Sequence, residues 1–284
     1  FRRTIKRKNE KDSFVWIAKE DKGYVSRFAR LRGLRGIRQR LSGEFSPFMV
    51  GQAGFSPEEA GNPFTDGEDF RFNAGIDDKL NLKSNLILNA TVNPDFGQVE
   101  VDPAVVNLTA YETFFEEKRP FFLEGANVFS FGEGGATAYY GFNFSNPSFF
   151  YSRRIGRSPQ GEAGHAGFQD YPDWSTILAA AKLSGKLGRG WNIGILNALT
   201  EREYAEVDAG GQRFRDEVEP LSDYGVLRLS REFAQGRQGI GLIATSVLRD
   251  LRSDGLESVL SRSALALAAD GWSFLGRDKT WVVT

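Results

Sequence analysis

The sequence predicts an all-β fold: an antiparallel meander that forms part of an outer-membrane β-barrel. Runs of about ten residues, such as 191–200, alternate between apolar and small or polar side chains, which is the periodicity of a strand. Short glycine-containing turns alternate with longer polar loops. The composition of 32 Gly, 24 Phe and one Met in 284 residues suits strands better than a helix bundle. Strands of this length, joined alternately by short turns and long loops, are typical of outer-membrane barrels.

The clearest strands form three pairs in the C-terminal half. The paired runs are 174–184 with 191–200, 221–231 with 239–248, and 261–275 with 280–283. Because consecutive strands of a meander reverse direction, the short turns should share one end of the sheet and the polar loops 201–219 and 249–257 the other. The turns are 185–190, 234–237 and 276–279. Alternation places five apolar side chains on one face, which we expect to contact lipid: Trp191, Ile193, Ile195, Leu227 and Leu229.

The N-terminal part also contains strand-like runs, at 24–34, 41–53, 69–76 and 80–92, with a turn predicted at 77–79. Residues 1–20 are interpreted as the tail end of a preceding domain or a linker. Residues 21–284 are interpreted as a partial barrel.

The segment 94–125 differs from its surroundings and predicts a short inserted helix over 102–116. Asp102 is a suitable N-cap and Pro103 a suitable first helical residue. Val105, Leu108 and Phe115 follow at helical spacing, and Pro120 is expected to end the helix. A helix this short and aromatic needs a wall to pack against, so we expect 94–125 to form a plug inside the barrel.

Two motifs resemble a known family. They read N-P-D-F-G-Q-V-E at 93–100 and F-F-E-E-K-R-P-F-F-L-E-G at 114–125, and Y-S-R-R-I-G-R at 151–157 also matches. The chain resembles a bacterial outer-membrane β-barrel family catalogued as domain of unknown function 5916. Its members usually carry a module like carbohydrate-binding family 9 before the barrel. The resemblance implies an outer-membrane location and a longer native protein, and it supplies no catalytic residues.

Composition excludes several kinds of site. The absence of cysteine excludes disulfides, thiolate metal sites and cysteine nucleophiles. His165 is the single histidine, which excludes multi-histidine metal sites, and its glycine-rich surroundings predict a solvated loop. Residues 1–40 hold 14 Lys/Arg against 4 Asp/Glu. No nucleic-acid-binding signature accompanies this charge, so we expect a solvated basic surface and no nucleic-acid partner.

Carboxylates gather in the central segment and allow three interpretations. They could be a glycosidase pair, or Asp95, Glu100 and Asp102 could bind Ca²⁺ through oxygen ligands. We favour the third, a structural network in which acids pair with arginines inside a polar lumen. The candidate site residues are Asp95, Glu100, Asp102, Glu112, Glu124, Arg153 and Arg154.

The arginines at 153, 154 and 157 could recognise an anion, because guanidinium groups match carboxylate and phosphate. We favour instead an arginine ladder along a lumen-facing strand, since alternation would put Arg153 and Arg154 on opposite faces.

The function expected from the sequence is an outer-membrane pore or a component for uptake or export, with no catalytic residues and no cofactor. Ca²⁺ is the one candidate ion, and outer-membrane lipid is the expected partner. One alternative is a surface module that binds glycans. A second is a carboxylate-based glycoside hydrolase.

Overall fold

The computed structural model describes residues 2–5, 10–13, 32–33, 42–55, 57–65, 67–83, 85–94, 113–132, 148–276 and 281–284. The chain divides into two units, residues 1–40 and 41–284. In the first unit, β1 (Arg2–Ile5) and β2 (Glu10–Ser13) form an antiparallel hairpin. The strand predicted at 24–34 lies outside the described residues except for 32 and 33.

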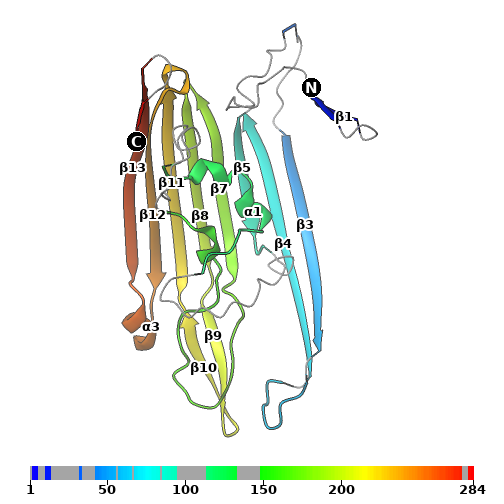
Figure 1. Ribbon diagram of the computed structural model, residues 1–284. Coiled ribbons are helices and arrows are strands. Elements are labelled where there is room, and N and C mark those ends of the chain that lie inside the picture. The colour runs from blue at the N-terminus through cyan, green and yellow to red at the C-terminus, as the bar shows by residue number, and fades with distance from the viewer. Residues whose placement is uncertain are drawn as a thin grey trace. The chain divides into compact units, whose positions relative to one another are not determined.

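The second unit is built on a nine-stranded antiparallel sheet (Figure 1). Its order is β14-β13-β12-β11-β8-β7-β5-β4-β3, so β3 and β14 are the edges of the described sheet. The strands are β3 (Ser42–Phe55), β4 (Glu68–Lys83), β5 (Leu86–Val92), β7 (Ile177–Gly188), β8 (Trp191–Thr200), β11 (Leu221–Phe233), β12 (Gln238–Asp250), β13 (Ser263–Leu275) and β14 (Trp281–Val283). This confirms the all-β antiparallel fold. None of the described helices has the length and apolar character of a transmembrane helix.

The two short turns that the structure describes, before β8 and before β12, lie at the same end of this sheet, as expected, and residues 277–279 of the third predicted turn lie outside the described residues. The Glu232 amide donates to the Gly190 carbonyl at 2.9 Å, and the Phe274 amide donates to the Arg237 carbonyl at 2.9 Å. The turn before β12 is a short 3-10 helix, η5 (Ala234–Gly236). The two polar loops lie at the opposite end (Figure 1). One contains α3 (Asp254–Val259). The other folds into β9 (Glu203–Ala209) and β10 (Gln212–Glu219), which form a three-stranded sheet with β6 (Phe168–Asp170).

The two faces of the nine-stranded sheet differ in chemistry. Directly opposed residues share a face, and Leu227 is opposite both Ile195 and Ala244. We call this the outer face, and the face of Arg228 and Ile243 the inner face. The five side chains that the sequence placed on one face all lie on the outer face. Large apolar side chains are exposed along it, from β3 to β13: Phe45, Met49, Phe70, Phe72, Ile76, Ile195, Leu227, Ile240, Leu242, Leu265 and Leu267.

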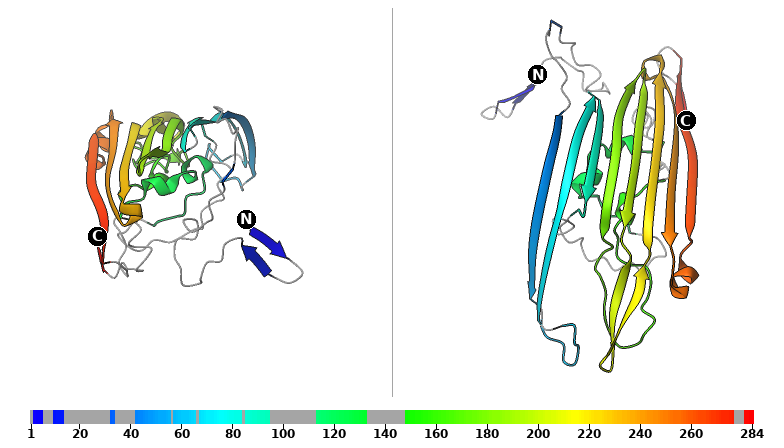
Figure 2. Two further views of the ribbon diagram at one scale, coloured as in Figure 1. Left: turned by 90° about the horizontal axis from the view of Figure 1, so that it is seen from above. Right: turned by 180° about the vertical axis from the view of Figure 1, so that it is seen from behind.

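The inner face is covered by two irregular segments. One carries α1 (Pro120–Leu123) and η3 (Ala126–Phe129), and the other carries η4 (Ser152–Arg154). The sheet curves around the α1 segment (Figure 2). The buried apolar core lies between these segments and the inner face: Phe122, Phe129, Ile155, Ile177, Ala180, Leu196, Ala198 and Val226. Gly194 makes room for this packing, because a Cβ there would stand 2.9 Å from the Phe129 ring.

The turn predicted at 77–79 is wrong. Strand β4 runs through these residues to Lys83, and the chain turns at Asn85. The Thr91 hydroxyl donates to Asp77 at 2.6 Å, and Lys79 forms an ion pair with Glu124. Two of the three charged residues that suggest a turn, Asp77 and Lys79, are therefore inner-face residues of a strand, and Asp78 between them lies on the outer face.

The helix predicted over 102–116 does not reach its expected end. Residues 113–119 are irregular, and 102–112 lie outside the described residues. The Phe115 amide donates to the Tyr151 hydroxyl at 2.8 Å instead of to a helical carbonyl. Pro120 begins a helix, α1, and does not end one, because proline lacks the amide hydrogen that the first helical residue does not need.

Candidate functional site

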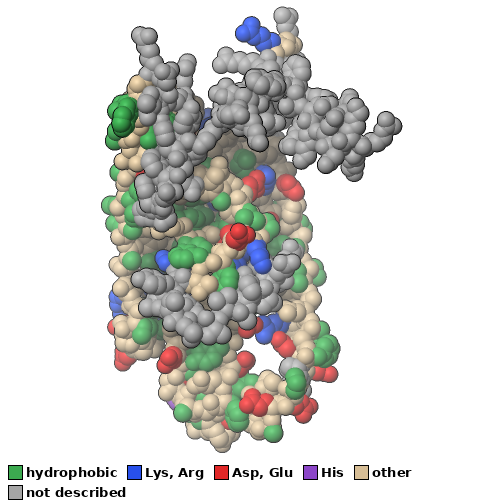
Figure 3. All heavy atoms as spheres, in the orientation of Figure 1, with side chains coloured by type: hydrophobic (Ala, Val, Ile, Leu, Met, Phe, Trp, Pro, Cys, Tyr) green, Lys and Arg blue, Asp and Glu red, His purple; other side chains and the backbone are tan. Residues whose placement is uncertain are grey.

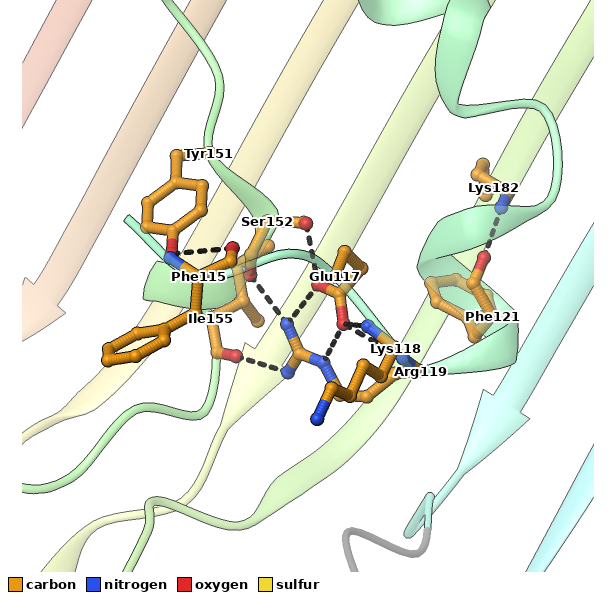
Figure 4. Close-up of polar contacts among 9 residues, drawn as sticks. All are labelled: Phe115, Glu117, Lys118, Arg119, Phe121, Tyr151, Ser152, Ile155 and Lys182. Atoms are coloured by element: carbon orange, nitrogen blue, oxygen red, sulfur yellow. Dashed lines mark hydrogen bonds and ion pairs between the residues drawn. The ribbon is translucent and has the colours of Figure 1, made fainter. Parts of the chain in front are cut away.

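The candidate site is the polar network that fastens the segment 113–132 to the inner face. Its first part surrounds Arg119, which is 6% exposed. The Arg119 guanidinium donates to both oxygens of Glu117 at 2.7 Å, to the Ser152 carbonyl at 2.8 Å and to the Ile155 carbonyl at 2.7 Å (Figure 4). The Ser152 hydroxyl also donates to Glu117 at 2.6 Å. Arg119 thus joins the two irregular segments to each other.

These contacts set the protonation of Glu117. Burial alone would raise the pKa of Glu117, but the hydrogen bonds and charge of Arg119 lower it below its ordinary value. Glu117 is therefore ionised at neutral pH. This charge suits an ion pair with Arg119, whereas a general acid would have to be protonated.

The second part of the network is centred on Lys182 of β7, which is 1% exposed. Its ammonium group donates to the backbone carbonyl of Phe121 in α1 (Figure 4). It also donates to the carbonyl of Glu124, the residue that follows α1. The Glu124 carboxylate forms an ion pair with Lys79 and accepts from Asn89 Nδ2 at 2.7 Å. Burial would raise the pKa of Glu124, but Lys79 and Asn89 lower it. The α1 segment is therefore held by β4, β5 and β7 together.

The third part fixes the far end of the segment. Arg228 of β11 donates to both carboxylate oxygens of Asp270 of β13, at 2.7 and 2.6 Å. Both side chains are 7% exposed. The same carboxylate accepts from the Gly132 amide at 2.7 Å. Figure 3, drawn from the side of Figure 1, shows Lys/Arg and Asp/Glu side chains beside one another on this side of the molecule.

A cavity of about 400 Å³ lies between the inner face of β11–β13 and the segment 149–157. Arg154, Arg157 and Arg249 line it together with Tyr151 and Tyr224. Arg157 donates to the side-chain oxygen of Gln160. The backbone amide and the side-chain amide of Gln160 in turn donate to Glu219, at 3.0 and 3.1 Å. Burial raises the pKa of Glu219, and Arg157 and Arg249 act in the opposite direction.

The structure describes three of the seven candidate residues from the sequence. Asp95, Glu100, Asp102 and Glu112 lie outside the described residues, so the calcium candidate stays a prediction. Glu124 pairs with Lys79 and Asn89 and not with the expected Arg153 or Arg154.

Arg153 and Arg154 belong to the 3-10 helix η4, so the predicted strand with its arginine ladder is wrong. Burial lowers the pKa of Arg153. Among the described residues, no group of three His, Cys, Asp or Glu side chains could hold a metal ion.

Sequence reasoning missed Lys79, Lys182, Arg228, Arg249 and Asp270. Each of them occupies an inner-face position of a strand. An isolated charge within a largely apolar run, at a position that alternation assigns to the inner face, was the signal available for finding them.

Residues 40–255 match the family model described as Domain of unknown function (DUF5916). The chain belongs to this family. No curated protein and no solved structure matches it. The part that matches DUF5916 begins next to β3 and ends within α3. It includes all the strands that hold the α1 segment and the arginines that line the 400 Å³ cavity. Asp270 of β13 lies beyond it.

Proposed function

We propose that the chain is part of a β-barrel of the bacterial outer membrane and serves as a pore or as a component for uptake or export. The observation that carries the proposal is the reversed polarity of the nine-stranded sheet. Met49, Leu265 and Leu267 on the outer face are 72%, 68% and 69% exposed, while Lys182 and Arg228 of the inner face are buried. Such an apolar surface is unfavourable in water and is the lipid-contacting surface of a membrane barrel.

Strand length and aromatic positions support the same proposal. Strands β3, β4, β7, β11, β12 and β13 have 12 to 16 residues, and a tilted strand of about 9–11 residues spans a bilayer. On the outer face, Trp191 and Phe233 lie at the end with the short turns, and Phe55 and Phe70 at the opposite end. Aromatic side chains at both ends of the strands are typical of the two membrane interfaces.

The segment 113–132 is the proposed constriction. It packs on the inner face and is fastened there by hydrogen bonds to the buried residues Lys182 and Asp270 and by the partly exposed Lys79–Glu124 ion pair. In a closed barrel this position would narrow the lumen, so the segment would limit what passes through.

A pair of arginine substitutions in one strand tests the lipid contact. Leu227 is on the outer face and 46% exposed. Ser230 is on the inner face and lines a polar cavity of about 390 Å³. In a bilayer, Leu227→Arg should cost about 2–4 kcal/mol near the midplane and reduce insertion into lipid vesicles. Ser230→Arg should insert like the wild type.

Water on the outer face would give a different result. A half-exposed leucine in water tolerates arginine at a cost within about 0.5 kcal/mol. Equal insertion and stability of Leu227→Arg and the wild type would therefore exclude the membrane barrel. The hydrolase alternative rests largely on acids of segment 95–112, outside the described residues. Among the described residues, no observation favours this alternative or the glycan-binding module over the pore.

A further inference from the structure

The cavity beside η4 has the composition of a binding site for an organic anion. Its volume of about 400 Å³ falls within the range of small-molecule sites. Three arginines line it, and none of its lining residues is Asp or Glu. Arg154 and Arg157 come from the η4 region, and Arg249 from the inner face of β12. The irregular backbone of η4 brings together arginines that a strand would have separated.

Two of these arginines keep unused donors. Arg157 is positioned by Gln160, and Arg249 Nη1 donates to the Ser261 carbonyl at 3.0 Å. The buried Nε–H groups of Arg157 and Arg249 have no hydrogen-bond acceptor among the described residues. A buried donor without an acceptor is costly, and an anion in the cavity would offset this cost through strong charge-assisted hydrogen bonds to the guanidinium groups of the same arginines. Glu219 is bonded to Gln160 and does not line the cavity. Its single carboxylate balances only part of the positive charge of the three arginines.

The remaining lining is largely apolar and aromatic. Phe150, Tyr151 and Ile155 face the cavity from one side, and Tyr224 and Val226 from the sheet. Phosphate or another small hydrated anion would leave these side chains without contacts. An anion attached to an apolar ring would bury them.

We propose that this cavity binds a small organic carboxylate whose apolar body is the size of a fused two-ring system. The carboxylate is held by Arg157 and Arg249, with Arg154 at the same wall, and the ring packs against Tyr151 and Tyr224. This site goes beyond the proposed pore. It requires the cavity alone, so it can hold whether or not the outer face contacts lipid.

Matched probes test the charge and the ring on the unaltered protein. The probes are 1-naphthaleneacetate, its neutral analogue 1-naphthaleneacetamide, and acetate, each titrated into the purified protein by calorimetry. The naphthalene carboxylate should bind at least about tenfold more tightly than the amide, because the amide cannot form the charged hydrogen bonds. Acetate should show no binding at the same concentrations. Equal affinities of the acid and the amide, or binding of acetate as tight as that of the acid, would overturn the proposal.

Three variants locate the binding. Arg249→Gln should weaken binding of 1-naphthaleneacetate at least about tenfold. Arg252→Gln makes the same charge change at an exposed residue outside the cavity, paired with Asp250, and should leave the affinity within about twofold. Ala266→Phe fills the cavity from β13 without changing any charge and should abolish binding. An Ala266→Phe variant that still binds, or an Arg252→Gln variant weakened as much as Arg249→Gln, would place the anion elsewhere.

Discussion

Replacing Lys182 with methionine should release α1 from the sheet. Methionine approximates the length of the lysine side chain, so packing is largely preserved while the ammonium group is lost. Two buried carbonyls, of Phe121 and Glu124, then lose their donor. A hydrogen bond from a charged donor contributes about 1.5–3 kcal/mol, and removal of a buried charge recovers part of the loss because the charge no longer has to be desolvated. We expect Lys182→Met to lower the free energy of unfolding by about 2–4 kcal/mol.

Urea unfolding and hydrogen exchange measure this effect in two ways. The amides of Leu123 and Glu124, bonded to the Arg119 and Pro120 carbonyls at 3.1 and 3.2 Å, should exchange faster in the variant. Lys186 supplies the control, because it lies on the same strand and face but is exposed, and Lys186→Met should change stability by less than about 0.5 kcal/mol. A Lys182→Met variant as stable as the control, with unchanged exchange in α1, would refute the role assigned to Lys182.

Two further substitutions test other parts of the network. Asp270→Asn leaves Arg228 buried without a charged partner, so the free energy of unfolding should fall by about 3–5 kcal/mol in urea titrations; a loss below about 1 kcal/mol would contradict the buried pair. The pKa of Glu117 is lowered from its ordinary value of 4.5, so its ionised form adds stability above pH 4.5 that is lost as the pH falls through the lowered pKa. Glu117→Gln should therefore be less stable at neutral pH and lose less stability on acidification than the wild type, and parallel pH profiles would contradict this.

The strands were predictable from the sequence where large apolar side chains alternate with small or polar ones, as in 191–196 of β8 and 226–230 of β11. The alternation in β8 and β11 is regular, because alternate side chains of a half-exposed strand meet different surroundings. The same principle misled at 77–79. There the inner-face residues Asp77 and Lys79 lie on either side of Asp78, which is on the outer face. Three consecutive charged residues, two of them Asp, are typical of a turn, so the sequence predicted one. Polar residues on an inner face cannot be distinguished from turn residues by composition.

The candidate site was predictable only where its partners are close in sequence. Glu117 and Arg119 are two residues apart, and both belong to the run E-E-K-R at 116–119 of the sequence motif. Lys182 and Glu124 are 58 residues apart, and Arg228 and Asp270 are 42 apart. The register of the sheet decides which inner-face charges meet, and a single sequence carries no direct record of that register.

The anchors of segment 113–132 lie far apart across the sheet, and this has a physical consequence. Lys79, Asn89 and Lys182 hold α1 to β4, β5 and β7, whereas Arg228 and Asp270 hold Gly132 to β11 and β13. One segment is therefore tied to strands near both sides of the described sheet. Shifting the segment would leave the buried Lys182 ammonium group without its two carbonyl acceptors at one end and the Gly132 amide without the Asp270 carboxylate at the other. The segment is thus held at two places by the sheet that it covers.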